Sequence, residues 1–369
     1  INDVLDMSKI ESGKLTLNID AVSLQETVEG IVNIIQPQVK AKKQSFDVFI
    51  RDIHRENVYC DSVRLNQVLL NLLSNALKFT PEGGSITLTV SQEASPKGED
   101  YVRTHFVVRD TGIGMSEEFQ QKIFESFARE DNRRVQRTEG TGLGMTITKY
   151  IVDEMQGTIT VSSQVDKGSE FRVTVDLQAV PDTGAPMHLP AWDMLVVDDD
   201  EQLCTSAAEN LCQIGVNAQW ATGGAQALAM AEERHRQGRD YYIILLDWKM
   251  PDMDGVETAR RLRAAVGDGV PILLISAYDW GDIESQARAA GITGFLPKPL
   301  FKSTLYHGLL PYAQSEEAGA KDAPARDTAP DFTGTRLLVA EDNELNWEIA
   351  NELLSAQGFT LDWAENGRL

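Results

Sequence analysis

Five short apolar runs, each followed by a helical pattern, occupy residues 193–312 and constrain the fold most strongly. The runs are 194–197, 216–220, 241–246, 272–275 and 293–296, and the helical patterns are 203–214, 223–236, 255–265, 282–290 and 301–310. Strands that alternate with helices through short connections favour a parallel, doubly wound sheet. Right-handed crossovers then place the C-terminal ends of all its strands at one edge.

Acidic, basic and hydroxyl side chains follow these strands at that edge. Asp198 and Asp199 follow the first strand, Asp247 the third, Ser276 the fourth and Lys298 the fifth. Three carboxylates at one place repel each other unless a cation lies between them, and Mg²⁺ suits an all-oxygen site. One carboxylate could then attack a phosphoryl group while the lysine and the hydroxyl stabilise its oxygens. The alternative, acids that only cap helices, does not account for Asp247 together with Lys298.

The first half of the chain shows a different pattern. Helices are predicted at 23–43 and 62–79, and strands at 15–19, 46–50, 86–90 and 101–108. The last two strands are separated by a turn and read as an antiparallel pair. Helices beside a sheet that reads as antiparallel indicate an α+β sandwich.

The helix at 62–79 carries polar residues where an ordinary helix would not need them. Asn71, Asn75 and Lys78 fall on one face, opposite an apolar stripe. Asparagine is a mediocre helix former because its amide competes with the backbone. Two explanations remain open: a solvated polar face, or a site where amide oxygens bind a hard cation and the lysine binds phosphate.

Two glycine clusters follow this helix. The first contains Asp110, Gly112 and Gly114, and the second consists of Gly140, Thr141, Gly142, Leu143 and Gly144 at the start of a helical pattern. Glycines let a ligand approach the backbone closely, and a helix N-terminus attracts phosphate. The carboxylate before the first cluster can accept a hydrogen bond from an exocyclic amine such as that of adenine. The dinucleotide-binding fingerprint is absent, because neither cluster lies in a βαβ unit.

A polar stretch connects the two clusters. Phe124 and Phe127 form an apolar pair, and residues 129–139 are polar and charged. A long polar loop that ends in a glycine-rich turn suggests a mobile lid. Arg133, Arg134 and Arg137 either reach phosphate or belong to a solvated loop.

These motifs resemble a known family. Residues 71–80, 110–114, 124–127 and 140–144 are similar, in order and spacing, to the N, G1, F and G2 boxes of sensor histidine kinases. The resemblance implies the Bergerat-type ATP fold shared with gyrase, the chaperone of ninety kilodaltons and the mismatch-repair ATPases. It implies Mg²⁺ on Asn75, phosphate contacts on Asn71 and Lys78, and the adenine amino group on Asp110. The glycine clusters would shape the pocket and its lid.

The second half resembles a receiver domain of the two-component system. The matching motifs lie at 196–199, 246–255 and 297–299. The resemblance implies that Asp247 is the phosphoacceptor and that Asp198 and Asp199 bind Mg²⁺ together with the backbone carbonyl of Lys249. It further implies that Ser276 and Lys298 contact the phosphoryl group.

Two more features come from the same resemblance. Phe295 stands where the family has its switching aromatic residue, and the Lys298–Pro299 bond is expected to be cis.

We divide the chain accordingly. Residues 1–14 resemble the end of a dimerisation helix, 15–182 are the ATP-binding domain, 183–192 a linker, 193–312 the receiver, 313–334 a flexible linker and 335–369 the start of a second receiver. In that second receiver Glu341 and Asp342 are half of a metal site, and the acceptor would lie past residue 369. The acceptor histidine is expected upstream of residue 1, so we expect a piece of a longer protein.

Composition narrows the classes of function. A net charge of −22 argues against broad nucleic-acid or anionic-membrane binding. Three cysteines without CxxC spacing argue against structural zinc and a disulfide framework. No apolar run is long enough to cross a bilayer. We expect a cytoplasmic location for this part of the protein, with anchoring of the whole protein in the inner membrane left open.

The sequence thus predicts the core of a hybrid sensor histidine kinase. It would bind ATP with Mg²⁺, phosphorylate an upstream histidine and pass the phosphoryl group to Asp247. Expected partners are a second copy, joined through upstream dimerisation helices, and a downstream phosphotransfer or response-regulator protein. The alternative is a catalytically silent ATP-binding scaffold whose receivers dock partners.

Overall fold

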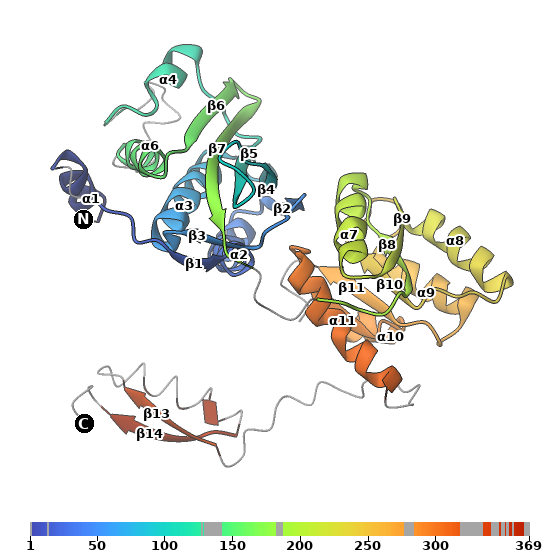
Figure 1. Cartoon of the computed structure of the whole chain (residues 1–369). Helices are drawn as coiled ribbons and strands as arrows, with labels where there is room; N and C mark the ends of the chain where they lie inside the picture. The colour runs from blue at the N-terminus through green and yellow to red at the C-terminus, as the bar shows by residue number, and fades with distance from the viewer. Residues whose placement is uncertain are drawn as a thin grey trace. The chain divides into compact units, whose positions relative to one another are not determined.

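The computed structural model describes residues 2–12, 15–126, 128, 142–181, 187–276, 284–317, 335–340, 347, 351, 354–355 and 358–364. These residues form two compact units, 1–313 and 314–369. Figure 1 shows the course of the chain through both. The first unit contains two sheets and the second contains a pair of strands.

The first sheet has seven strands in the order β1-β3-β7-β5-β4-β2, with β6 paired to β7. They are β1 (Asp20–Ser23), β2 (Ser45–Arg51), β3 (Asn57–Cys60), β4 (Ser85–Ala94), β5 (Tyr101–Asp110), β6 (Thr158–Gln164) and β7 (Gly168–Ala179). The pairs that the structure describes are antiparallel except β2 with β4. The sheet is therefore mixed, not purely antiparallel as the pattern suggested.

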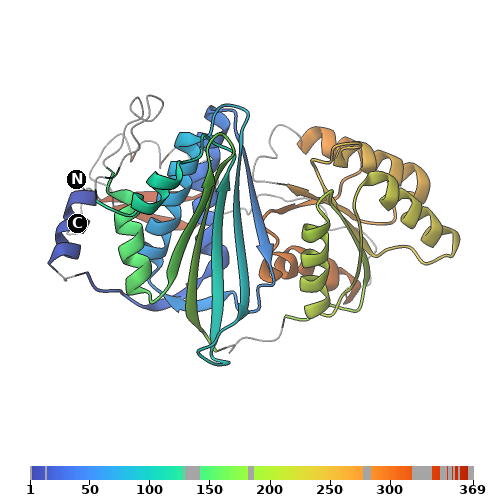
Figure 2. The ribbon, with the colours of Figure 1, turned by 90° about the horizontal axis from the view of Figure 1, so that it is seen from above.

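The helices of this part are α1 (Asn2–Glu11), α2 (Leu24–Ala41), α3 (Ser62–Phe79), α4 (Glu117–Lys122) and α6 (Gly144–Glu154). Figure 2 shows helices stacked on one face of the seven-stranded sheet. The apolar stripe predicted on α3 is confirmed, because Leu65, Leu69, Leu72 and Ala76 are all buried. The predicted strand at 15–19 is wrong: pairing begins only at Asp20, and Ile19 is 53% exposed.

The start of α3 is tied to the segment before it by two carboxylates. Asp61 caps the helix by accepting from the Arg64 amide, and it also accepts from the Asn18 amide at 2.8 Å. Asp6 of α1 accepts from the Arg64 guanidinium at 3.2 Å and from the Gln67 side chain at 2.9 Å. The first turn of α3 is thus connected to α1 and to the chain that follows it.

The second sheet is the predicted parallel, doubly wound sheet. Its strands are β8 (Asp193–Val197), β9 (Asn217–Ala221), β10 (Ile243–Asp247), β11 (Ile272–Ser276) and β12 (Gly294–Pro297), in the order β12-β11-β10-β8-β9. Its helices are α7 (Glu201–Gln213), α8 (Gly224–Arg236), α9 (Gly255–Val266), α10 (Glu284–Ala289) and α11 (Lys302–Glu317). Successive residues of the central strands enter two different core clusters, because both faces of the sheet are covered.

The residues between the two sheets are partly ordered against the second one. Leu189 and Trp192 are buried, and the Trp192 ring stacks on Tyr242 with centroids 4.4 Å apart. Residues 187–192 therefore belong to the packing of the receiver-like part. At its other end, α11 continues to Glu317, beyond the residue 312 at which we expected that part to end.

The second unit pairs β13 (Arg336–Ala340) with β14 (Thr360–Ala364) in parallel. Trp347 stacks on Trp363, with ring centroids 5.4 Å apart. The predicted acids Glu341 and Asp342 lie outside the described residues.

Candidate functional site

Three carboxylates meet at the C-terminal edge of the parallel sheet. Asp247 is the last residue of β10, and Asp198 and Asp199 directly follow β8. One oxygen from each lies within 4.8 Å of the others. Asp198 and Asp247 are buried, whereas Asp199 is exposed. The structure thus brings together the acids that the strand pattern placed at one edge, and this all-oxygen set fits a magnesium ion.

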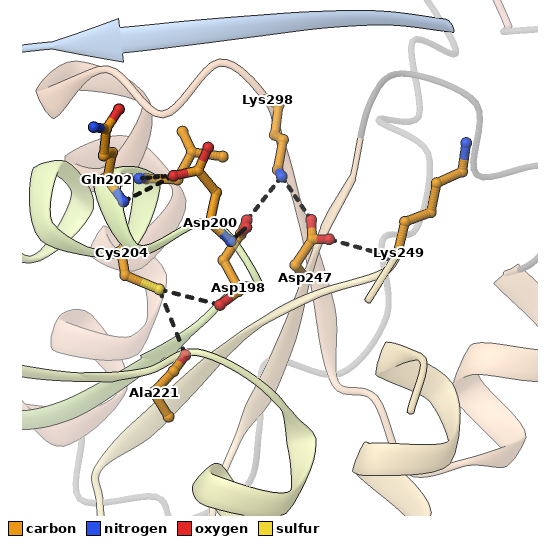
Figure 3. A network of polar contacts seen from close by, with 9 residues as sticks. Asp198, Asp200, Gln202, Cys204, Ala221, Asp247, Lys249 and Lys298 are labelled. Carbon is orange, nitrogen blue, oxygen red and sulfur yellow. Dashed lines mark hydrogen bonds and ion pairs between the residues drawn. The ribbon is translucent and has the colours of Figure 1, made fainter. Parts of the chain in front are cut away.

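Both oxygens of Asp247 have partners in the chain (Figure 3). Lys298 Nζ lies 2.7 Å from Asp247 Oδ1, and the Lys249 amide donates to Asp247 Oδ2 at 2.9 Å. The same ammonium lies 2.9 Å from Asp198 Oδ2. One cation therefore bridges the two buried carboxylates.

The charges at this edge are strongly perturbed. Burial raises the pKa of Asp247 to about 6; the Lys298 charge opposes this shift and the Asp198 charge adds to it. Burial alone would lower the pKa of Lys298, but Asp247 and Asp198 outweigh it and raise the pKa above its usual value. A single ammonium does not fully compensate the buried carboxylates, so the site favours a further positive charge.

Two other predicted residues of this edge, Ser276 and Phe295, lie in β11 and β12. Ser276 is buried at the end of β11, and its carbonyl accepts from the Lys298 amide at 2.9 Å. Phe295 of β12 is half-buried, with the Arg288 guanidinium 5.5 Å from its ring. The Lys298–Pro299 bond is cis, which confirms that prediction.

Two further residues near this edge have structural contacts. Helix capping by Asp199 or Asp200 was expected from their place after the first strand, and Cys204 was expected only to be a buried thiol. Asp200 caps α7 by accepting from the Gln202 and Leu203 amides. Cys204 is buried beneath the acids and donates to the carbonyls of Asp198 and Ala221 (Figure 3). Burial raises the pKa of Cys204 to about 12, so the thiol stays protonated and supports the backbone of the acid loop. Only the fold, and no sequence spacing, brings Cys204 beneath the acid loop.

A second constellation lies between α3 and α6. Asn71 Nδ2 donates to the Gly144 carbonyl at 3.2 Å and to the Thr148 hydroxyl at 3.3 Å. Asn75 Nδ2 lies 3.3 Å from the Met145 sulfur. The two asparagines therefore face the first turn of α6, and a fully solvated polar face is wrong for them.

The first turn of α6 suits an anion. The residue at its N-cap position, Leu143, makes no side-chain hydrogen bond to the helix, and Gly142 before it has a φ of +72°. Amide groups at a helix N-terminus bind phosphate readily. On α3, Lys78 is half-buried, with its ammonium 5.2 Å from the Phe79 ring.

The first glycine cluster packs against the end of α3. Asp110 is buried at the end of β5 and accepts from the Gly112 amide at 2.8 Å. Burial raises its pKa, and the amides of Gly112 and Ser169 oppose that shift. A Cβ on Gly112 would lie 2.5 Å from the Phe79 carbonyl oxygen, and one on Gly114 would lie 1.9 Å from the Gln164 carbonyl oxygen. These positions therefore require glycine.

Thr80 also belongs to this constellation, although no separate role was predicted for it. Its hydroxyl is buried, and among the residues that the structure describes it has no hydrogen-bond partner. It follows Phe79, whose carbonyl accepts from the Ile113 amide. An orphaned buried hydroxyl beside a glycine cradle and a buried carboxylate fits a polar ligand such as a nucleotide base.

Several predicted residues cannot be placed. Gly140, Thr141, Phe127, Arg133, Arg134 and Arg137 lie outside the described residues. Phe124 is described and packs, partly buried, against the core of the first sheet.

Two family models match the parts of the chain that carry these constellations. Residues 60–179 match the histidine kinase-, DNA gyrase B- and HSP90-like ATPase family. Residues 194–309 match the response regulator receiver domain. The chain joins a histidine kinase-type ATPase domain to a receiver domain. The Bergerat-type and receiver folds expected from the motifs are confirmed.

Curated relatives of this ATPase–receiver chain include a sensor kinase/phosphatase and a sensory/regulatory protein. The autoinducer 2 sensor kinase/phosphatase LuxQ of Vibrio vulnificus is 31% identical over 84% of the chain and 36% of the relative. The sensory/regulatory protein RpfC of Xanthomonas campestris pv. campestris is 31% identical over 90% of the chain and 50% of the relative. The chain therefore spans between a third and a half of the length of these relatives.

A solved structure of another protein matches this chain over its whole length. The crystal structure of full-length ShkA in complex with AMPPNP has a TM-score of 0.62 and 24% identity, and the match covers 100% of this chain and 72% of that one. This likeness supports the fold. Within the described residues, no helix combines the length and apolar character needed to cross a membrane.

Proposed function

We propose that the ATPase and receiver domains form the core of a hybrid histidine kinase. The ATPase domain binds ATP with Mg²⁺ and phosphorylates a histidine upstream of Ile1, and Asp247 then accepts the phosphoryl group. The observation that carries the proposal is the arrangement around Asp247, whose two oxygens contact Lys298 and the Lys249 amide beside two further acids. A structural ion pair would not require two more carboxylates at the same place.

The ATPase domain contributes nucleotide binding. Asp110 would accept the adenine amine, and Gly112 and Gly114 would let the base approach the backbone. Asn71 and Asn75, oriented by α6, together with Lys78, would hold the phosphates and a magnesium ion. When bound, that ion would offset charge on the transferring phosphoryl group.

In the receiver, the Asp247 carboxylate attacks the phosphorus of the phosphohistidine. An O–P bond forms, the N–P bond breaks, and its electron pair returns to the imidazole, which leaves Asp247 as an acyl phosphate. Lys298 stays within reach of the new oxygens, and the Ser276 hydroxyl would donate to them. A magnesium ion on Asp198, Asp199, Asp247 and the Lys249 carbonyl would neutralise the remaining charge. A downstream phosphotransfer or response-regulator protein would take the group from Asp247.

The test uses the full-length protein with γ-labelled ATP. The wild type should carry an acid-labile label on a histidine and a hydroxylamine-sensitive label on Asp247, and Asp247→Asn should keep only the first. Asp252→Asn, at an exposed acid of the same domain, is the control and should behave as wild type. No histidine label, or a hydroxylamine-sensitive label on Asp247→Asn, would refute the proposal.

A further inference from the structure

The start of α11 contacts the ATPase domain although it belongs to the receiver. Phe301 is fully buried, and the other residues of its core cluster come from the ATPase domain. Two residues later, the Ser303 amide donates to Glu56 Oε1 at 3.1 Å. The Ser303 hydroxyl donates to Gln25 Oε1. The segment just after the receiver's last strand is thus anchored to α2 and to the chain before β3.

A second contact joins α7 to the sheet of the ATPase domain. Ser206 is buried, and its hydroxyl donates to the Ile50 carbonyl at 2.8 Å. Ile50 lies in β2, which ends the described strand order of the seven-stranded sheet. An edge strand has unpaired backbone groups, and this serine satisfies one of them.

Both contacts are close in sequence to the phosphoacceptor site. Phe301 follows Lys298 by three residues, and α7 begins just after Asp198 and Asp199. The residues that contact the ATPase domain therefore lie in α7 and at the start of α11, directly after the two loops that carry Asp198, Asp199 and Lys298.

Strand β2 also lies near the acid pocket itself. Asp47 of β2 is exposed to solvent; its surroundings raise the pKa of its carboxyl through desolvation, and the charges of Lys298 and Lys249 oppose that shift. In Figure 3 a strand in the blue colours of the N-terminal part passes above Lys298. A carboxylate beside this pocket repels an incoming phosphoryl group.

We propose that Gln25, Glu56 and the edge of β2 form an intramolecular docking surface for the receiver, and that the docked receiver is shielded from the phosphohistidine. The receiver must then detach before Asp247 can be phosphorylated. The shielding rests on the proposed role of Asp247 as acceptor, whereas the docking does not.

The test is a charge reversal across the Ser303–Glu56 contact in the full-length protein. Ser303→Glu places a carboxylate against Glu56 and should release the receiver. Glu56→Lys added to that variant replaces the repulsion with attraction and should restore docking, a rescue that misfolding cannot produce. Ser285→Glu, at an exposed serine of α10, is the matched control.

Two measurements separate docking from shielding. Hydrogen–deuterium exchange of residues 24–28 and 50–56 should rise at least threefold in Ser303→Glu and return in the double variant. With labelled ATP, the ratio of early label on Asp247 to label on the histidine should rise at least threefold and return likewise. If hydrogen–deuterium exchange of these residues is unchanged in Ser303→Glu, or rises equally in the Ser285→Glu control, the docking proposal is wrong. Raised exchange with an unchanged ratio overturns the shielding, and no label on either residue refutes the proposed function instead.

Discussion

Lys298 and Asp247 form a buried ion pair with 2.7 Å between Nζ and Oδ1 at the C-terminal edge of the parallel sheet. Only part of the local negative charge is compensated by it, because Asp198 shares the same ammonium and Asp199 lies close by. Without a metal ion, negative charge at this edge therefore remains uncompensated. The free energy of unfolding of the receiver should change when one of these charges is removed.

Removing the ammonium should destabilise the receiver. In Lys298→Ala, Asp247 and Asp198 would stay buried without a cation. The free energy of unfolding should therefore fall by ~3–5 kcal/mol. Binding of Mg²⁺ to the folded state should increase the free energy of unfolding of Lys298→Ala by more than it increases that of the wild type. Urea unfolding with EDTA and with Mg²⁺ measures both effects. Arg236→Ala, at an exposed cation, should show neither, and an equal Mg²⁺ effect in all three proteins would contradict the interpretation.

Neutralising Asp247 should stabilise the metal-free receiver at neutral pH. A folded-state pKa of about 6, above the unfolded value of 3.8, means that ionisation costs folding free energy as pH rises through that interval. Asp247→Asn should therefore be more stable than wild type above pH 6, by up to ~3 kcal/mol. The advantage should shrink as pH falls from 6 towards 4. Thermal unfolding in EDTA across this range measures it, and a constant or reversed difference would refute it.

Adding a methyl group at Gly112 should impair nucleotide binding. Its Cβ would lie 2.5 Å from the Phe79 carbonyl oxygen and 2.7 Å from Asp110 Oδ1, so the cluster must shift away from α3. We expect Gly112→Ala to weaken ATP binding at least tenfold, measured by calorimetry with a non-hydrolysable analogue. Gly30→Ala in α2 has no atom within 4 Å of the new group and should bind normally. Normal binding by both variants would argue against a nucleotide at this cluster.

Replacing the Asp110 carboxylate should weaken adenine recognition. A hydrogen bond to a charged group is worth about 1.5–3 kcal/mol, so Asp110→Asn should bind the ATP analogue roughly tenfold to a hundredfold less tightly. Asp100→Asn, at an exposed turn between β4 and β5, is the control. Unchanged affinity in Asp110→Asn would remove this residue from the base-binding site.

The sequence predicted the receiver better than the ATPase domain for a physical reason. Its five strands are covered on both faces, so each is a continuous apolar run that can be located without knowing its partners. In the ATPase domain β3 pairs with β1 and β7, which are remote in sequence, and none of β3, β6 and β7 was predicted. The segment at 15–19 has strand-like alternation but lacks a strand partner.

The same distinction applies to the sites. The acids and Lys298 were predictable because parallel strands end at one edge, and the glycines because they recur as clusters. Thr80 and Cys204 are brought to the sites only by tertiary packing. No sequence spacing indicates the unpartnered hydroxyl of Thr80 or the thiol of Cys204 that supports the acid loop.

The hydrogen bonds at the start of α3 connect that helix directly to α1. Asp6 contacts Arg64 and Gln67 in its first two turns, and α3 is 18 residues long, or about 27 Å. The far half of the same helix carries Asn71 and Asn75 against α6. A displacement of α1 would therefore be transmitted along one continuous helix to the face that we propose binds the nucleotide.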